Sequence, residues 1–92
     1  MSIAPFSTSE SRAALEELKE IIRGIAPPGK IEAHAFRLVG ESQDVIDGEA
    51  RELFEALQHQ LPPFSRSEAF GLAFALRELI RERIMEIEGN AA

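Results

Sequence analysis

An uncharged run of eight residues, Ala69 to Leu76, constrains the fold more than any other part of the sequence. It reads Ala-Phe-Gly-Leu-Ala-Phe-Ala-Leu, and at helical pitch its side chains point almost all the way round. A helix that is apolar on every side has to be enclosed by other elements. The sequence therefore predicts a long, largely buried C-terminal helix with the rest of the chain packed around it.

Capping signals and helix breakers divide the rest of the chain. Ser-x-x-Glu patterns, which are typical of capping boxes, begin at Ser7 and at Ser65. Two proline pairs and Gly40 stand where helices should end. Ninety-two residues make a single domain, 1–92. We therefore expect a flexible tail at 1–6 and helices at about 8–25, 29–39, 43–61 and 66–88.

The segment from Lys30 to Val39 is the ambiguous one. As a strand it would have no clean apolar face, whereas as a helix it clusters Ile31, Ala35 and Leu38 on one side. The helical interpretation fits better, and Gly40 then provides the stop. With four helices joined by short loops, the predicted fold class is all-α, a compact four-helix bundle.

Two features of the last helix leave alternatives open. Its apolar stripe has coiled-coil-like spacing and includes Ile80, Ile84 and Ile87. The stripe is interpreted either as core packing against the first helix or as the seam of a homodimer. Gly71 costs helix stability, so it indicates close approach of another helix. The alternative is a ligand pocket between Phe70 and Phe74.

The net charge of −6 is concentrated in one segment, because residues 41–60 hold six acids and one base. Dipole preferences at a helix start and an ordinary solvated face account for part of this pattern. The functional hypothesis is a surface that steers a basic protein partner. Its candidate residues are Glu41, Asp44, Asp47, Glu49, Glu52 and Glu55.

Composition argues against several other classes. A net acidic domain lacks the basic face that direct nucleic-acid binding needs. No apolar stretch approaches a membrane span, and the N-terminus does not resemble a signal peptide. The chain has no cysteine, which fits a reducing cytoplasm.

No cofactor, catalytic or metal motif is recognisable, so an enzyme is not expected. His59 follows Glu52 and Glu55 on one helix face and is interpreted as a surface residue rather than a metal ligand.

One histidine resembles a known family over about ten residues. The string Ala33-His34-Ala35-Phe36-Arg37 is similar to histidine phosphotransfer domains, which are four-helix bundles phosphorylated on an exposed histidine. Arg37 stands where that family usually has a lysine, but Leu38 stands where it has a glycine. The resemblance implies phosphoryl transfer through His34, which we rank below two other hypotheses. The first is an acidic binding module, such as an adaptor, inhibitor or immunity-type protein. The second is a homodimeric subunit.

Overall fold

The computed structural model describes residues 8–61 and 63–90, and these form four α-helices and no strand. The expected all-α fold is therefore confirmed, and the tail predicted at 1–6 lies outside the described residues. Within the described ranges, no helix is long and apolar enough to cross a membrane. The helices are α1 Thr8–Ile25, α2 Pro28–Leu38, α3 Gln43–Leu57 and α4 Arg66–Asn90, with a short 3₁₀ turn, η1, at Gln58–Gln60.

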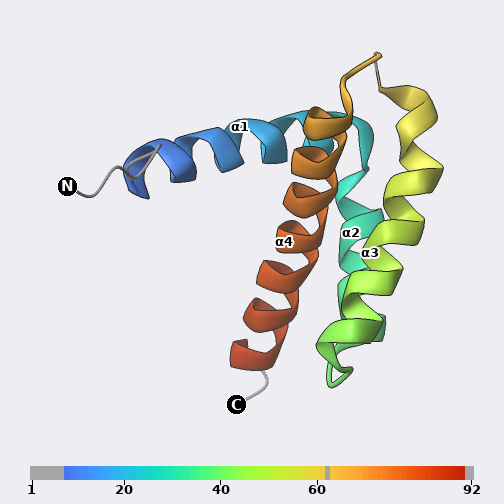
Figure 1. Cartoon of the computed structure of the whole chain (residues 1–92). Coiled ribbons are helices and arrows are strands. Elements are labelled where there is room, and N and C mark those ends of the chain that lie inside the picture. Colours follow the sequence, from blue (N-terminus) through green and yellow to red (C-terminus); the bar gives the residue numbers. More distant parts are fainter. Residues whose placement is uncertain (1–7, 62, 91–92) are drawn as a thin grey trace.

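The C-terminal helix α4 is the centre of the fold, as the sequence predicts. It packs against α1, α2 and α3, whereas α2 and α3 contact each other less. Figure 1 shows α2 and α3 alongside α4, while α1 runs across it and extends away from the other helices at its N-terminal end. Three helices thus pack on α4, and the contact made by α1 is as extensive as those made by α2 and α3.

The hydrophobic core draws on every helix. Ile22 of α1, together with Leu76 and Ile80 of α4, has the largest side chains that are fully buried. These residues sit on the apolar stripes that the helical periodicity identifies. The core residues of α2 and α3 that join them are Ala35, Leu38, Ile46, Ala50, Leu53, Phe54 and Leu57.

Local signals place the starts of α3 and α4. At the start of α4, Ser65 Oγ accepts a hydrogen bond from the Glu68 backbone N–H at 3.2 Å. Glu68 Oε1 accepts one from the Ser65 N–H at 2.9 Å, so the predicted capping box is formed. The Ser65 bonds lower the pKa of the Glu68 carboxyl. Ser42 caps α3 by accepting a bond from the Val45 N–H at 3.4 Å.

The ends of α2 and α3 follow from glycine and proline. Gly40 has a φ of +85°, the left-handed conformation that terminates α2. The prediction of a third helix up to residue 61 is wrong by one turn, because α3 ends at Leu57 and continues as η1. Leu61 has a ψ of 148°, the extended conformation expected of a residue that precedes proline.

One prediction about α4 needs correction, because the uncharged run is not enclosed on every side. The side chain of Phe70 is 72% exposed and that of Phe74 is 45% exposed. Helix α1 crosses at Gly71, where an added Cβ would lie 3.1 Å from Leu18 Cδ1, so the close approach predicted at this glycine is confirmed. Helix α1 therefore covers the face of α4 that carries Gly71, while the face that carries Phe70 and Phe74 stays largely uncovered.

The far end of α4 packs within the chain, in agreement with the first of the two interpretations. Ile80 and Ile84 are buried, and Ile87 packs against the same core. Near the end of the helix, Ile84 lines one hollow together with Leu38 of α2 and Ile46 of α3. The stripe is therefore part of a common core to which α2 and α3 contribute together with α1.

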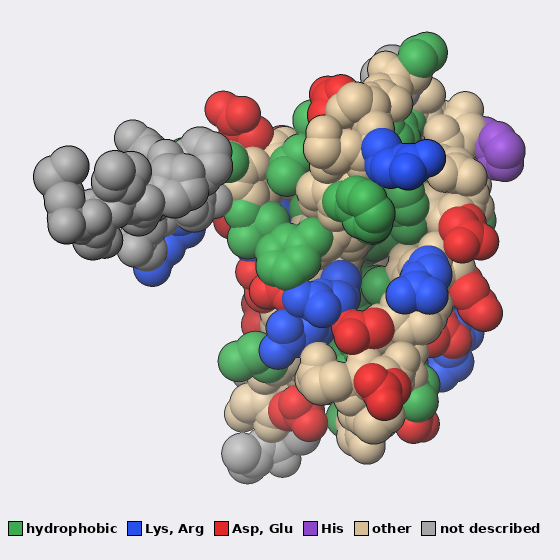
Figure 2. Space-filling view, viewed as in Figure 1, with side chains coloured by type: hydrophobic (Ala, Val, Ile, Leu, Met, Phe, Trp, Pro, Cys, Tyr) green, Lys and Arg blue, Asp and Glu red, His purple; other side chains and the backbone are tan. Residues whose placement is uncertain are grey.

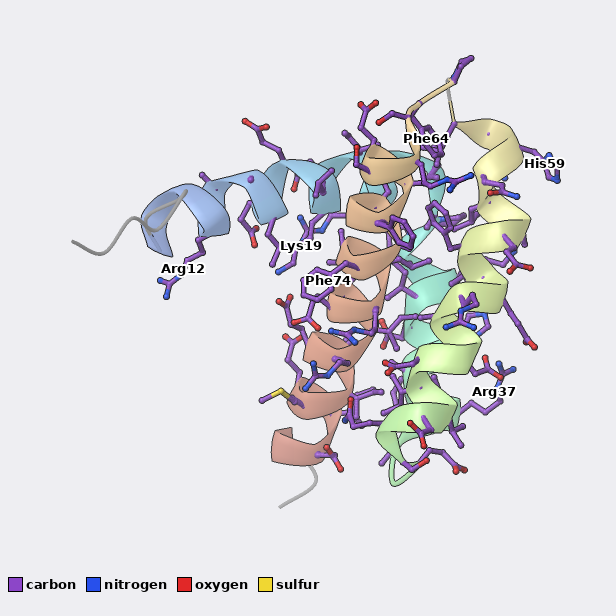
Figure 3. All side chains as sticks on the ribbon, viewed as in Figure 1. Arg12, Lys19, Arg37, His59, Phe64 and Phe74 are labelled. Carbon is purple, nitrogen blue, oxygen red and sulfur yellow. The ribbon has the colours of Figure 1, made fainter. Side chains whose placement is uncertain are left out.

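A buried ion pair ties α1 to α4. The Lys19 side chain is only 4% exposed, and its Nζ lies 2.5 Å from Glu82 Oε2 and 3.0 Å from Glu16 Oε2. The hydrogen bond to Glu82 is the largest influence on the pKa of Lys19, and it raises this pKa above 10.5 although burial opposes the shift. Figure 3 shows Lys19 projecting from α1. This charge is the polar exception within the otherwise apolar contact between the two helices.

Candidate docking groove between α3 and α4

A groove of about 460 Å³ lies between α3 and α4. We call it the docking groove. Its residues come from α3, from the first residue of η1 and from α4, and they combine small and aromatic side chains with charged ones. The residues that line it are Asp47, Ala50, Arg51, Phe54, Glu55, Gln58, Arg66, Ala69, Phe70, Ala73, Phe74 and Arg77.

Small residues are part of the reason why the two helices leave a hollow. Ala50 of α3 and Ala69 and Ala73 of α4 all line it, and none of them fills the space between the helices. Phe54 is buried beneath them and contacts Phe64 at a centroid distance of 6.5 Å, with the rings tilted by 51°. This aromatic contact supports the apolar lining from inside.

Two exposed aromatic rings border the docking groove on the α4 side. Phe70 and Phe74 are four residues apart, so they lie one above the other on one face of the helix. Figure 3 shows Phe74 at α4, and Figure 2 shows apolar side chains gathered over this part of the surface. Exposed phenylalanines beside an apolar hollow are typical of surfaces that bind other molecules.

Arg77 is fixed at one end of the docking groove by its neighbours. Its guanidinium lies over the Phe74 ring, with 4.7 Å from Cζ to the ring centroid. Long contacts join Nη1 to Asp47 at 3.4 Å and Nη2 to Glu78 at 3.5 Å. Its buried Nε has no hydrogen-bond acceptor among the described residues. The guanidinium is therefore held in place with donor capacity left over.

Arg51 and Arg66 stand on opposite sides of the docking groove, one on each helix. Neither has a carboxylate within ion-pair distance among residues 8–61 and 63–90. Figure 2 shows Lys and Arg side chains around the apolar patch, with the acidic side chains mostly further out. In a chain of net charge −6, this groove is a place where arginines outnumber carboxylates.

The six acids predicted to bind a partner do not all share one free face. Asp47 and Glu49 are partly buried and are engaged within the chain, Asp47 with Arg77 and Glu49 with His34 and Arg37. They turn toward α4 and α2 respectively, because each lies at the edge of the exposed face of α3. Four others are exposed and have no ion-pair partner in the described ranges: Glu41, Asp44, Glu52 and Glu55.

Glu49 joins α3 to α2. Its Oε2 lies 2.9 Å from His34 Nδ1 and also pairs with Arg37. Burial alone would raise the pKa of the Glu49 carboxyl, but the hydrogen bonds from Arg37 and His34 outweigh it and hold this pKa below 4.5. These contacts give Glu49 a structural part in the fold, which the sequence pattern alone did not indicate.

The two histidines occupy different surroundings. The His34 side chain is 19% exposed and contacts Glu49 and Arg37, so it is not the freely exposed histidine that a phosphotransfer resemblance leads one to expect. His59 is exposed in η1 and projects into solvent in Figure 3. Glu52 and Glu55 are also exposed, and no group of three potential metal ligands gathers anywhere in the described part of the chain.

Sequence reasoning found one side of this site and missed the other. The alternative of a pocket beside Phe70 and Phe74 came from Gly71, although the hollow lies toward α3 while the glycine faces α1. The arginines were missed because Arg51 stands within an acidic segment and Arg66 within a capping box. Arg51 and Arg66 come together only because α3 packs beside α4. That packing has to be known before the two arginines can be assigned to one site.

Comparison with other proteins gives no further guidance. No family model, curated protein or solved structure matches this chain.

Proposed function

We propose that this protein is a non-catalytic binding module that docks on another protein through the docking groove. The observation that carries the proposal is the exposure of Phe70 and Phe74 beside an apolar hollow. Burying two such rings would remove a large apolar area from water, which is the dominant favourable contribution to most protein association. Because the chain has no cysteine, a partner in the reducing cytoplasm fits this proposal.

Groove geometry favours this function over the homodimer built on the last helix. Ile80 and Ile84, two residues of the proposed dimer seam, are already buried within the single chain, and Ile87 is half-buried. A seam made of these side chains would require the core to open first. Phe70 and Phe74 need no such rearrangement, because they are exposed in the folded chain.

The exposed acids of α3 support a second docking surface, for a basic partner. Glu41, just before α3, and Asp44, Glu52 and Glu55 within α3 remain exposed, and Glu55 also lines the docking groove. We call these four residues the acidic edge. Charges at such a rim mainly accelerate association and make it sensitive to salt. Glu52→Gln with Glu55→Gln should then slow association with a basic partner and flatten its salt dependence. An association rate that is unchanged at low salt would count against the acidic edge.

Quantitative capture tests the docking groove. Tagged wild-type protein, a Phe70→Ala/Phe74→Ala variant and a Phe36→Ala control are used to capture proteins from the native host. Phe36 is a good control because it is 57% exposed but lies on α2 and does not line the groove. We expect a partner to be retained by wild type and Phe36→Ala and reduced at least about tenfold with the double variant. Equal recovery with all three proteins would contradict the proposal.

A further inference from the structure

The docking groove has the length of a short helix, and this inference rests on the proposed function of that groove. Its α4 wall extends from Arg66 to Arg77, and its other wall extends from Asp47 of α3 to Gln58, the first residue of η1. At 1.5 Å per residue, each wall is about 16 Å long, which corresponds to about three helical turns. An amphipathic helix that binds in a groove uses apolar anchors spaced over two to three turns.

The apolar features of the docking groove suit such a helix. Phe70 and Phe74 are separated by one turn, so they can flank the anchors of a helix that lies along α4. Small side chains at Ala50, Ala69 and Ala73 leave room for large aliphatic anchors between the walls. Because α3 and α4 present rigid helical walls, little ordering of the groove would oppose binding.

The charges around the docking groove indicate what the helix carries beside its apolar face. Arg51 and Arg66 have no intrachain carboxylate partner in the described ranges, and Arg77 retains donor capacity. Guanidinium groups pair with carboxylates through two parallel hydrogen bonds. Asp47 contacts Arg77, and Glu55 also lines the groove, so the preference for an acidic partner rests mainly on Arg51 and Arg66.

We propose that the docking groove binds an amphipathic partner helix of about three turns that carries carboxylates beside its apolar face. Phe70 and Phe74 contact its aliphatic anchors, and the three arginines pair with its acidic residues. The groove and the acidic edge of α3 would then select opposite charges, which would let one small domain bridge two different partners.

Two designed peptides test this inference directly. Each has about 18 residues with leucines at helical spacing, and the remaining positions are rich in Glu in one peptide and in Lys in the other. Binding of the labelled peptides to the full chain is measured by fluorescence anisotropy at low salt. The contact surface is mapped by amide chemical shifts. We expect the Glu peptide to bind at least about tenfold more tightly and to perturb α3 and α4 at the groove.

Variants of the full chain complete the test. Phe70→Ala/Phe74→Ala should weaken the Glu peptide at least about tenfold, and Arg51→Gln/Arg66→Gln about three- to tenfold with a smaller salt dependence. Phe36→Ala should change nothing. If the Lys peptide binds the groove as well or better, the acidic helix is wrong but groove docking stands. If the Glu peptide does not bind, or binds elsewhere, the inference is overturned, and the capture experiment alone then decides the proposed function.

Discussion

Three charged side chains at the contacts between helices are buried to different degrees, and they differ in the partners that they contact. Lys19 is almost completely buried and has two carboxylates, whereas Glu49 and Arg77 are partly buried and have both charged and aromatic or imidazole neighbours. Burial of an ionised group is tolerated when its hydrogen bonds are replaced within the protein. Together with the ion pair at 2.9 Å between Arg83 of α4 and Glu32 of α2, these three residues add polar specificity to the helix contacts.

Glu49 should make the protein sensitive to acid. Its folded-state pKa lies below 4.5, so its stabilising effect is complete above that pH and is lost as the pH falls through the folded-state value. The difference in unfolding free energy between wild type and Glu49→Gln should therefore shrink as the pH is lowered below 4.5. Urea unfolding at each pH measures it. A difference that is constant over this range would mean that Glu49 is not held as an ionised partner.

Gly48 is a residue at which the fold is weaker than it needs to be. It lies inside α3 with an ordinary negative φ, and a Cβ added there would meet no atom within 4 Å. Gly48→Ala should stabilise the protein by about 1 kcal/mol, because alanine is the better helix former. Gly40→Ala is the matched control and should destabilise, since its φ of +85° is strained for alanine. Thermal unfolding compares the two, and a loss of stability in Gly48→Ala would be the contrary result.

At the scale of elements, α4 organises the bundle and α1 is attached to it differently from the others. Helix α1 contacts α4 through Leu18 at Gly71 and through Lys19 at Glu82, which lies three turns further along α4. Further along, Ile84 lies beside Leu38 of α2 and Ile46 of α3. The docking groove lies between α3 and α4, where Phe70 and Phe74 stay exposed.

Removing the carboxylate partners of Lys19 should destabilise the protein more than removing the Lys19 ammonium itself. Glu16→Ala/Glu82→Ala would leave a buried ammonium without a carboxylate and should cost about 3 kcal/mol. Lys19→Met should change stability by less than about 1 kcal/mol, because Glu16 and Glu82 are about half exposed and remain solvated.

The same contact should respond to alkaline pH. Since the folded-state pKa of Lys19 is raised, its stabilising effect is complete below pH 10.5 and is lost as the pH rises through the folded-state value. The loss should be smaller in Lys19→Met. Denaturant unfolding on both sides of that pH measures the effect. Identical pH profiles for the two proteins would show that the ion pair does not hold α1 in place.

The buried stripe of α4 separates a core role from a dimer role. Ile80 is fully buried, so Ile80→Ala should lower the unfolding free energy by about 2–5 kcal/mol. The mass measured by light scattering should stay the same, near 10.2 kDa for the single chain. A wild-type mass of twice this value that falls to one chain in the variant would instead establish the homodimer seam.

The existence of the helices, most of their ends and the central position of α4 could be predicted from the sequence, but the side-chain partners between helices could not. The capping box at Ser65 and the stop at Gly40 depend only on neighbouring residues, and both are formed. The charge pattern singled out Asp47 and Glu49 as candidate partner-binding acids, but it could not show that they contact Arg77 of α4 and His34 and Arg37 of α2. The groove between α3 and α4 depends on the same packing of distant segments.

For the whole molecule, positive and negative side chains are distributed differently around the exposed apolar surface, which the net charge alone does not reveal. The chain is acidic overall, yet arginines surround its exposed phenylalanines while the acidic edge of α3 lies beside them. Apolar contacts supply most of the binding free energy, whereas charges mostly set the association rate and the specificity. The apolar lining of the groove should therefore determine how tightly a partner binds, and the charges should determine which partner binds.

Site-specific photocrosslinking tests the docking groove most directly. A benzophenone side chain replaces Phe70 in one protein and Phe36 in another, and both are irradiated in cells of the native host. We expect position 70 to give a discrete adduct with a partner that Arg51→Gln/Arg66→Gln weakens, and position 36 to give none. No adduct at position 70, or the same adduct from both positions, would contradict a docking surface between α3 and α4.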